Sequence, residues 1–332
     1  MSQHIHSSMN KLISGDGLDG DEFSICDFTI ADQNSVAESQ GITPTTPSNF
    51  KPVLGSNVTY VVACVIINES NEVLMMQEAK ESCAGKWYLP AGRMEKGESI
   101  VQAAAREVLE ETGLECTPTT LLVVETAGGM WYRFVMTATV VGGELKTPAK
   151  ADKESLQAKW IGNLQEITLR SNDIIHIIEK AQSYQQNKNN DWHDDILPAP
   201  IPHVKDLLRL IVVIKKRSTN KLHVLLSEKT ALHYPTCEIN PAKSVHSTLR
   251  RFMVEMFGAD VGQHRPLGLL NVEHDPSADG CCLTLLVAFR APLEEVPLIG
   301  KCVWQELPRE SESKLLSIIT TKNSSIELHV VR

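Results

Sequence analysis

Apolar and polar positions follow a regular pattern from about residue 59 onward. Two strongly apolar runs, residues 61–67 and 73–76, flank a cluster of turn-forming residues at 68–71, which predicts a strand, a turn and a second strand. Residues 99–112 then place apolar side chains on one side and Glu and Arg on the other, with the spacing of a helix. Gly113 is a typical residue to end that helix.

The following segment continues the alternation of strands and helices. We expect strands at residues 87–89, 121–125, 131–141 and 157–161, and a second helix at residues 173–182. Strands and helices that alternate around one sheet system indicate an α/β or α+β domain, which we place at residues 56–190.

The C-terminal part of the chain repeats this pattern. Asn71 of the first turn aligns with Asn220, and residues 99–113 (SIVQAAAREVLEETG) align with residues 244–258 (SVHSTLRRFMVEMFG). Such internal similarity is typical of a duplicated structural unit. We therefore predict a second α/β domain at residues 203–332, joined to the first by a Pro-rich linker at residues 191–202.

Residues 1–55 differ in composition from both domains. They are rich in Ser, Asp, Gly, Thr and Pro, and they show little periodicity. A segment of this kind buries too little apolar surface to offset the entropy lost on ordering. We predict a disordered N-terminal tail and linker.

Charge and composition exclude several classes of function. The 332 residues carry a net charge of −9, so nucleic acid is not an expected partner, because binding its backbone requires a basic surface. No apolar stretch has the length of a membrane span, and the eight cysteines lack zinc spacing. We expect a soluble, intracellular, cytoplasmic protein with free cysteines; the sequence does not indicate its oligomeric state.

The first predicted helix carries a dense group of acidic side chains. Glu107 and Glu111 are four residues apart and share a face, and Glu110 lies beside them. Three carboxylates within one turn repel one another, whereas a hard divalent cation such as Mg²⁺ converts them into ligands. Arg106 is placed to hold a carboxylate by a forked hydrogen bond. The alternative is a solvated acidic helix face.

The spacing of these residues distinguishes the two interpretations. Residues 92–114 (GRMEKGESIVQAAAREVLEETGL) match the Nudix signature G-x5-E-x7-R-E-U-x-E-E-x-G-U at every fixed position, where U is a bulky apolar residue. Residues 59–182 thus resemble the Nudix hydrolase family. The resemblance implies an α/β/α sandwich with a mixed sheet and hydrolysis of a nucleoside diphosphate linked to another moiety.

The resemblance also implies roles for individual residues. Metal ligands would be Glu107, Glu111 and Glu110 with the carbonyl of Ala91, holding Mg²⁺, for which Mn²⁺ can substitute. Arg106 would orient the glutamates, and Glu98 would link the loop to the helix. Gly92 and Gly113 would form tight turns. Glu110 and Glu111 are the candidates for the general base, with Glu154 as an outside choice.

Flanking strings resemble the animal Nudix hydrolases that act on oxidised guanine nucleoside diphosphates. These strings include residues 78–80, 87–94 and 154–158. A small-molecule nucleoside diphosphate is then the expected partner. Candidate substrate-binding residues are Leu74, Met76, Lys80, Arg93, Trp131, Phe134, Asn172 and Asp173. A buried, protonated Asp173 could donate to the base; the alternatives are helix capping for Asn172 or Asp173, core packing for the apolar residues and solvated charge for the basic ones.

The second predicted domain lacks the acidic pattern. In the alignment Glu107 falls on Phe252 and Glu111 on Met256, which predicts a degenerate, catalytically inactive Nudix-like domain. Two other functions stay open for the chain: a Nudix pyrophosphatase for ADP-ribose or another nucleoside diphosphate derivative, and a nucleotide-binding regulator without turnover.

Overall fold

The computed structural model describes residues 2–18, 25–128, 130–187, 192, 193 and 195–331. The chain forms two compact units. The central unit comprises Thr59–Glu125 and Tyr132–Leu197. The terminal unit comprises Met1–Val58, Thr126–Trp131 and Pro198–Arg332. Among the described residues, no helix is both long and apolar enough to cross a membrane.

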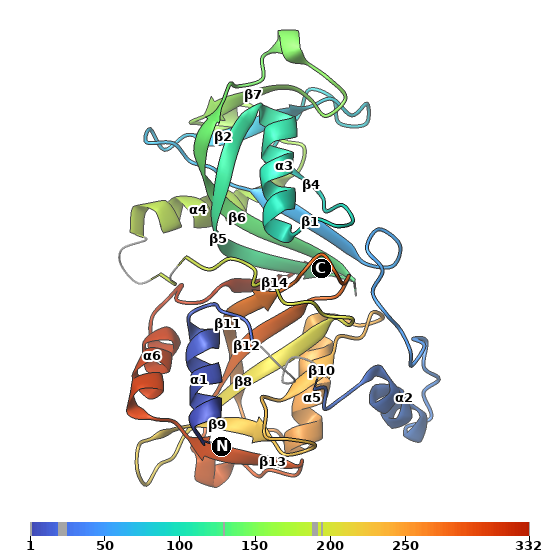
Figure 1. Cartoon of the computed structure of the whole chain (residues 1–332), viewed down its shortest axis with the longest axis vertical. Coiled ribbons are helices and arrows are strands. Elements are labelled where there is room, and N and C mark those ends of the chain that lie inside the picture. Colours follow the sequence, from blue (N-terminus) through green and yellow to red (C-terminus); the bar gives the residue numbers. More distant parts are fainter. Residues whose placement is uncertain (1, 19–24, 129, 188–191, 194, 332) are drawn as a thin grey trace. The chain divides into compact units, whose positions relative to one another are not determined.

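The described residues of the central unit form two groups of strands and two α-helices (Figure 1). Its strands are β1 (Thr59–Cys64), β2 (Val73–Glu78), β3 (Trp87–Tyr88), β4 (Ala91–Arg93), β5 (Leu114–Ala127), β6 (Trp131–Gly143) and β7 (Ser155–Ile161). Strands β5, β6, β1 and β4 are neighbours in that order, and β3, β2 and β7 form a second, antiparallel sheet. The helices are α3 (Ile100–Thr112) and α4 (Ile175–Asn187).

The two helices cover opposite faces of the strands. Cys64 and Ile66 pack in one cluster with Val108 of α3. The alternate residues Ala63 and Val65 pack in another cluster, which contains the buried side chains of α4. Because successive side chains of a strand point to opposite faces, this alternation places the sheet between the helices. The predicted α/β/α sandwich is confirmed for the central unit.

The terminal unit repeats this order of elements. Its strands are β8 (Leu207–Lys215), β9 (Leu222–Ser227), β10 (Thr236–Glu238), β11 (His264–Glu273), β12 (Cys282–Phe289), β13 (Cys302–Glu306) and β14 (Glu327–Val330). Its helices are α1 (Ser2–Ile13), α2 (Ile30–Ser39), α5 (Val245–Phe257) and α6 (Arg309–Thr320). The strand order β11-β12-β8, with β10 paired to β8, corresponds to the order β5-β6-β1-β4 of the central unit. The pair β9-β13 corresponds to the pair β2-β7.

Local geometry also repeats between the units. Asn71 and Asn220, which align in the sequence, both adopt positive φ (59° and 55°) in the turn after the first strand. Ser99 and Ser244, which also align, both cap the N-terminus of their helix with the side-chain oxygen. These matches support the proposal that the C-terminal half is a second unit of the same fold.

The expectation of a disordered tail at residues 1–55 is wrong for the described part of that segment. Ile5, Met9 and Leu12 of α1 are buried in the core of the terminal unit. Helix α2 begins at a capping box formed by Thr29 and Asp32. The apolar spacing of four and three residues in α1 gives a buried helical stripe, which the polar overall composition concealed.

Part of the predicted linker is also ordered. Ala199 forms a β-bridge with Glu273, and its N–H donates to the Val272 carbonyl at 2.8 Å. The two compact units meet in the sequence at Leu197 and Pro198. Residues 191 and 194 of the predicted linker lie outside the described residues.

Candidate active site

Helix α3 is fixed at both ends by local chemistry. The Ser99 side chain accepts from the Gln102 N–H, and the Gln102 side chain accepts in return from the Ser99 N–H, at 3.2 Å and 2.8 Å. At the other end Gly113 adopts the left-handed conformation (φ 77°) that glycine takes without strain. A Cβ on Gly113 would also collide with the Glu144 carbonyl. The helix therefore presents its acidic residues in a defined register.

Arg106 gathers the carboxylates around the start and middle of α3. Its Nε and Nη2 donate to the two oxygens of Glu98 at 3.0 Å and 2.7 Å, a bidentate pair. Its Nη1 donates to Glu107 at 2.8 Å and to Glu110 at 3.1 Å. Glu98 in turn accepts from the Glu95 N–H at 2.6 Å. The predicted orienting role of Arg106 and the loop-to-helix role of Glu98 both agree with these contacts.

Glu107 and Glu111 are buried, with 8% and 3% of their surface exposed. Burial raises the pKa of Glu107, and the contacts with Arg106 only partly oppose it. Burial also raises the pKa of Glu111 well above its ordinary value, although its Oε2 accepts from the Ala91 N–H at 2.8 Å. Carboxylates whose charge is destabilised in this way gain most from a bound cation.

Gly92 allows the loop to approach Glu107. A Cβ built on Gly92 would collide with the Glu107 carboxyl group. Gly92 lies in β4, opposite Val62 of β1, and Ala91 lies opposite Ala63. Because Gly92 has no side chain, the strand can pass directly over the Glu107 carboxylate. Glycine is therefore required here for close approach, and not for the tight turn that the sequence analysis predicted.

Glu78 adds a carboxylate that the sequence analysis did not single out. It ends β2 and is 1% exposed, and it contributes to the raised pKa of Glu111. Its Oε1 accepts from Arg170 at 2.5 Å, whereas its Oε2 has no hydrogen-bond partner among the described residues. A buried carboxylate oxygen without a donor fits a cation ligand or its bound water. The side-chain set therefore fits a divalent metal ion.

A second polar cluster lies at the start of α4. Arg133, on β6, donates to Asp173 at 2.7 Å and to the Tyr88 hydroxyl at 2.8 Å, and it pairs with Glu125. Tyr88 donates to Asp173 at 2.9 Å. The Arg170 guanidinium lies over the Tyr88 ring at 4.3 Å, so contacts link this cluster to Glu78.

These contacts correct two expectations about Asp173. Burial would raise the pKa of Asp173, but hydrogen bonds from Ser171, Arg133 and Tyr88 outweigh it and lower that pKa, so the carboxyl group is ionised rather than protonated. The cap of the short 3₁₀ helix Asn172–Ile174 is Ser171, not Asn172 or Asp173. The Asp173 carboxylate is thus a hydrogen-bond acceptor that the Arg133 guanidinium holds in place, and 39% of the Asp173 side chain is exposed.

Comparison with known proteins shows to which family this chain belongs. Residues 58–181 match the NUDIX domain. The chain is 38% identical to the 8-oxo-dGDP phosphatase NUDT18 of Homo sapiens, over 92% of this chain and 96% of that protein. The chain belongs to the Nudix hydrolase family. The mouse protein of the same name is 39% identical (84% and 89% covered), and the Danio rerio protein 35% identical (86% and 83% covered).

Nudix hydrolases generally need divalent metal ions. In this Nudix unit the predicted ligands Glu107, Glu110 and Glu111 lie together on α3, as the signature implies. Glu110 differs from the other two because 45% of its side chain is exposed. The predicted outside choice for the base, Glu154, lies near enough to raise the pKa of Glu107.

Three predicted substrate-binding residues are core residues of the Nudix unit. Leu74 and Met76 are 0% and 1% exposed, and they belong to two different core clusters. Phe134 is 0% exposed and packs against Tyr60 and Tyr132. Their side chains present no surface to a ligand, so the core-packing alternative holds for them.

The remaining predicted substrate-binding residues have exposed or partly exposed positions. Lys80 and Arg93 are exposed. The charge of Lys80 offsets part of the rise that burial causes in the pKa of Glu111. The Arg93 carbonyl accepts from Arg106 at 3.1 Å. Asn172 is exposed beside Asp173, whereas Trp131 groups with the terminal unit.

Proposed function

We propose that this chain hydrolyses oxidised guanine nucleoside diphosphates, 8-oxo-dGDP and 8-oxo-GDP, to the monophosphate and phosphate. Such a reaction removes damaged nucleotides from the precursor pool. The observation that carries the proposal is the identity of 38% with an 8-oxo-dGDP phosphatase over 92% of the chain, together with a full set of signature residues in bonding contact.

The residues of α3 have separate tasks in this proposal. Glu107 and Glu111 bind Mg²⁺, or Mn²⁺ in its place, with Glu78 and the Ala91 carbonyl beside them. The bound ion would lower the pKa of a water molecule and offset charge on the phosphoryl oxygens. Arg106 keeps Glu107 and Glu110 in place, and Glu110 is exposed enough to take a proton from water as general base.

Base recognition is assigned to the cluster around Asp173. An ionised carboxylate accepts hydrogen bonds, and the Watson–Crick edge of an oxidised guanine offers N–H donors. Arg133 and Tyr88 fix the direction of the Asp173 carboxylate, while part of it stays exposed. Asn172 is placed to add an amide contact next to it.

The terminal unit takes no part in catalysis in this proposal. Helix α5 carries Phe252 and Met256 where α3 carries Glu107 and Glu111, and both apolar side chains are buried. Without two of the three carboxylates, α5 offers too few oxygen ligands for a magnesium site of the α3 kind.

A nucleotide panel with separate detection of phosphate and pyrophosphate tests the proposed reaction. We expect 8-oxo-dGDP to give the monophosphate and phosphate in the presence of Mg²⁺, with a kcat/KM at least about tenfold above that for ADP-ribose or dGDP. The double substitution Glu107→Gln with Glu111→Gln removes two ligand charges and should abolish phosphate release. The matched control Glu115→Gln changes an exposed residue just beyond the helix and should keep full activity.

Two results would contradict the proposal in different ways. Faster turnover of ADP-ribose than of 8-oxo-dGDP would keep the hydrolase and replace the substrate. Nucleotide binding with no release of phosphate or pyrophosphate by the wild type would indicate the regulator instead.

A further inference from the structure

Helix α5 of the terminal unit keeps the geometry of α3 but reverses its charge. With the caps Ser99 and Ser244 superimposed in the alignment, Glu98 falls on Lys243 and Arg106 falls on Arg251. Two of the three carboxylates that neutralise Arg106 are therefore replaced, Glu98 by a lysine and Glu107 by Phe252, whereas the third, Glu110, is kept as Glu255. A site that gathers negative charge in one unit gathers positive charge in the other.

The N-terminal segment forms one side of an open pocket beside α5. The Phe28 ring stacks on Phe252 at 5.9 Å between centroids, with 6° between the planes. Gln33 of α2 donates to the Glu238 carbonyl at 2.8 Å and accepts from Asn240 at 3.2 Å. The resulting pocket has a volume of about 350 Å³, and α2 forms one of its walls.

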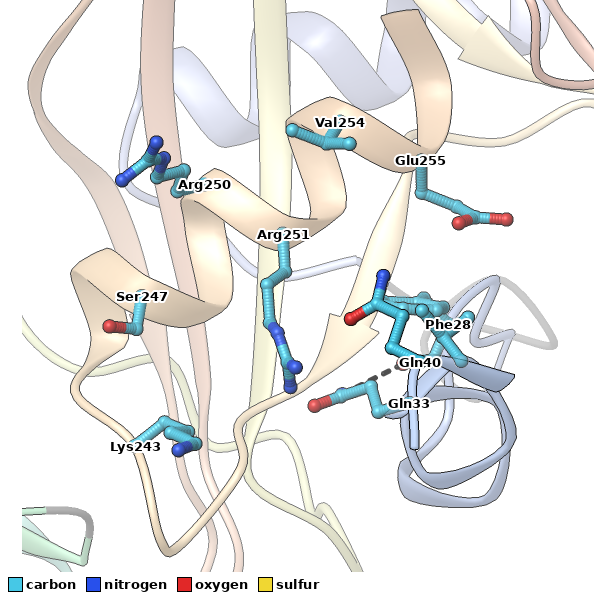
Figure 2. A pocket seen from close by; sticks show the side chains of 10 residues that line it. Phe28, Gln33, Gln40, Lys243, Ser247, Arg250, Arg251, Val254 and Glu255 are labelled. Atoms are coloured by element: carbon cyan, nitrogen blue, oxygen red, sulfur yellow. Dashed lines mark hydrogen bonds between the residues drawn. The ribbon is translucent and has the colours of Figure 1, made fainter. Parts of the chain in front are cut away.

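The cations of the pocket have no acidic partner of their own. Lys243, Arg250 and Arg251 line the pocket, and none of the three forms an ion pair with the residues that the structure describes. Figure 2 shows Arg251 directed toward Gln33 and Arg250 pointing away from it, with Lys243 on the loop just before α5. Like charges that line one pocket repel each other unless an anion lies between them.

The start of α5 adds to the positive potential. Lys243 directly precedes the cap residue Ser244, and Ser247 in the first turn also lines the pocket. The N-terminus of a helix of 13 residues carries a partial positive charge that favours phosphate groups. Side-chain charge and helix dipole therefore act in the same direction.

We propose that this pocket binds a small metabolite through a phosphate or diphosphate group, without a metal ion. The volume lies in the range of pockets for small molecules. An arginine recognises phosphate through a forked pair of hydrogen bonds, and a lysine adds a point charge. Glu255, at the opposite end of the pocket in Figure 2, selects a ligand with N–H or O–H donors at its uncharged end. This site is separate from the catalytic residues of α3.

Titration calorimetry on the full chain in EDTA tests the site, with ADP and inorganic pyrophosphate as probes. EDTA removes the metal ion on which binding at α3 depends. We expect saturable binding with a stoichiometry of one, weakened at least about tenfold by Arg251→Gln and further by adding Lys243→Gln, because each change removes a charged hydrogen bond. The control Arg265→Gln removes an exposed arginine of β11 in the same unit and should leave the affinity unchanged.

The same measurements can overturn the proposal. An affinity for pyrophosphate no higher than that for sulfate would indicate a general attraction of anions. Equal binding by the wild type and the Lys243→Gln, Arg251→Gln double variant would place the ligand elsewhere, and no heat with either probe at millimolar concentration would exclude the site. Unchanged 8-oxo-dGDP hydrolysis in the double variant would show that its loss of binding is separate from the proposed catalytic function.

Discussion

At the scale of single residues, Gly92 shows how a signature position acts through space rather than through chemistry. The strand that contains it passes so close to α3 that any Cβ at this position would overlap the Glu107 carboxyl group. The same carboxyl group accepts from Arg106 at 2.8 Å. A methyl group would therefore displace a predicted metal ligand while leaving its charge in place.

We expect Gly92→Ala to lower kcat at least about tenfold and to weaken Mg²⁺ binding, since a shift of about 1 Å in a catalytic group costs that much or more. The fold should persist, because Glu107 can rotate toward solvent. Steady-state kinetics against Mg²⁺ concentration measures the effect. Gly162→Ala is the control, because its added Cβ would meet Glu72 only at 3.6 Å; an active Gly92→Ala enzyme would disprove the steric role.

The residues that the sequence could and could not predict differ in where their partners lie. Glu98, Arg106 and Glu107 belong to one continuous motif, and their contacts follow from its spacing. Glu78 and Arg170 are 92 residues apart, and nothing local marks them as a pair. The sequence marks Asp173 as a candidate for binding the base, which stays a prediction; its ionised state depends on Arg133, 40 residues away, so its protonation could not be predicted.

At the scale of elements, α1 shows the limit of composition as a guide. Its polar residues suggested disorder, yet Ile5, Met9 and Leu12 form one buried stripe. That spacing was the available signal. Its meaning depends on apolar partners such as Ile211 and Leu315, about 200 residues or more away in the sequence, which no local pattern could reveal.

Met9 provides a direct test of α1 as a structural element. Its side chain is 0% exposed, so Met9→Ala should lower the free energy of unfolding by about 2–5 kcal/mol, through lost burial and the cavity left behind. Urea denaturation measures this change. Ile42→Ala, at a residue that is 52% exposed in the same N-terminal segment, should change stability by no more than about 0.5 kcal/mol. Equal effects of the two changes would mean that α1 does not contribute to the core.

At the scale of the whole molecule, Glu107 and Glu111 of the central unit and the buried Glu273 and His274 of the terminal unit change stability in opposite directions as the pH falls. In the central unit, burial raises the pKa of Glu107 and Glu111, so the metal-free fold gains stability as the pH falls toward their ordinary values. In the terminal unit, burial would raise the pKa of Glu273, but Arg209 and His203 lower it to about 2. Burial lowers the pKa of His274 to about 4. Both of these groups make the terminal unit sensitive to acid.

His274 loses its contribution to stability as the pH falls, because it is neutral in the folded state. Because its folded pKa of about 4 lies below its ordinary value of 6.5, its contribution is complete above pH 6.5 and is lost as the pH falls toward 4. Between about pH 7 and pH 5 this loss is about 2 kcal/mol for the wild type. His274→Asn should remove that part of the pH dependence, whereas His246→Asn, at an exposed residue of α5, should retain it. Hydrogen exchange with mass spectrometry in EDTA, corrected for the intrinsic rate, should locate the acid-induced loss in β8, β11 and β12. Faster exchange in β1 and β6 instead would show that the central unit is the acid-sensitive one.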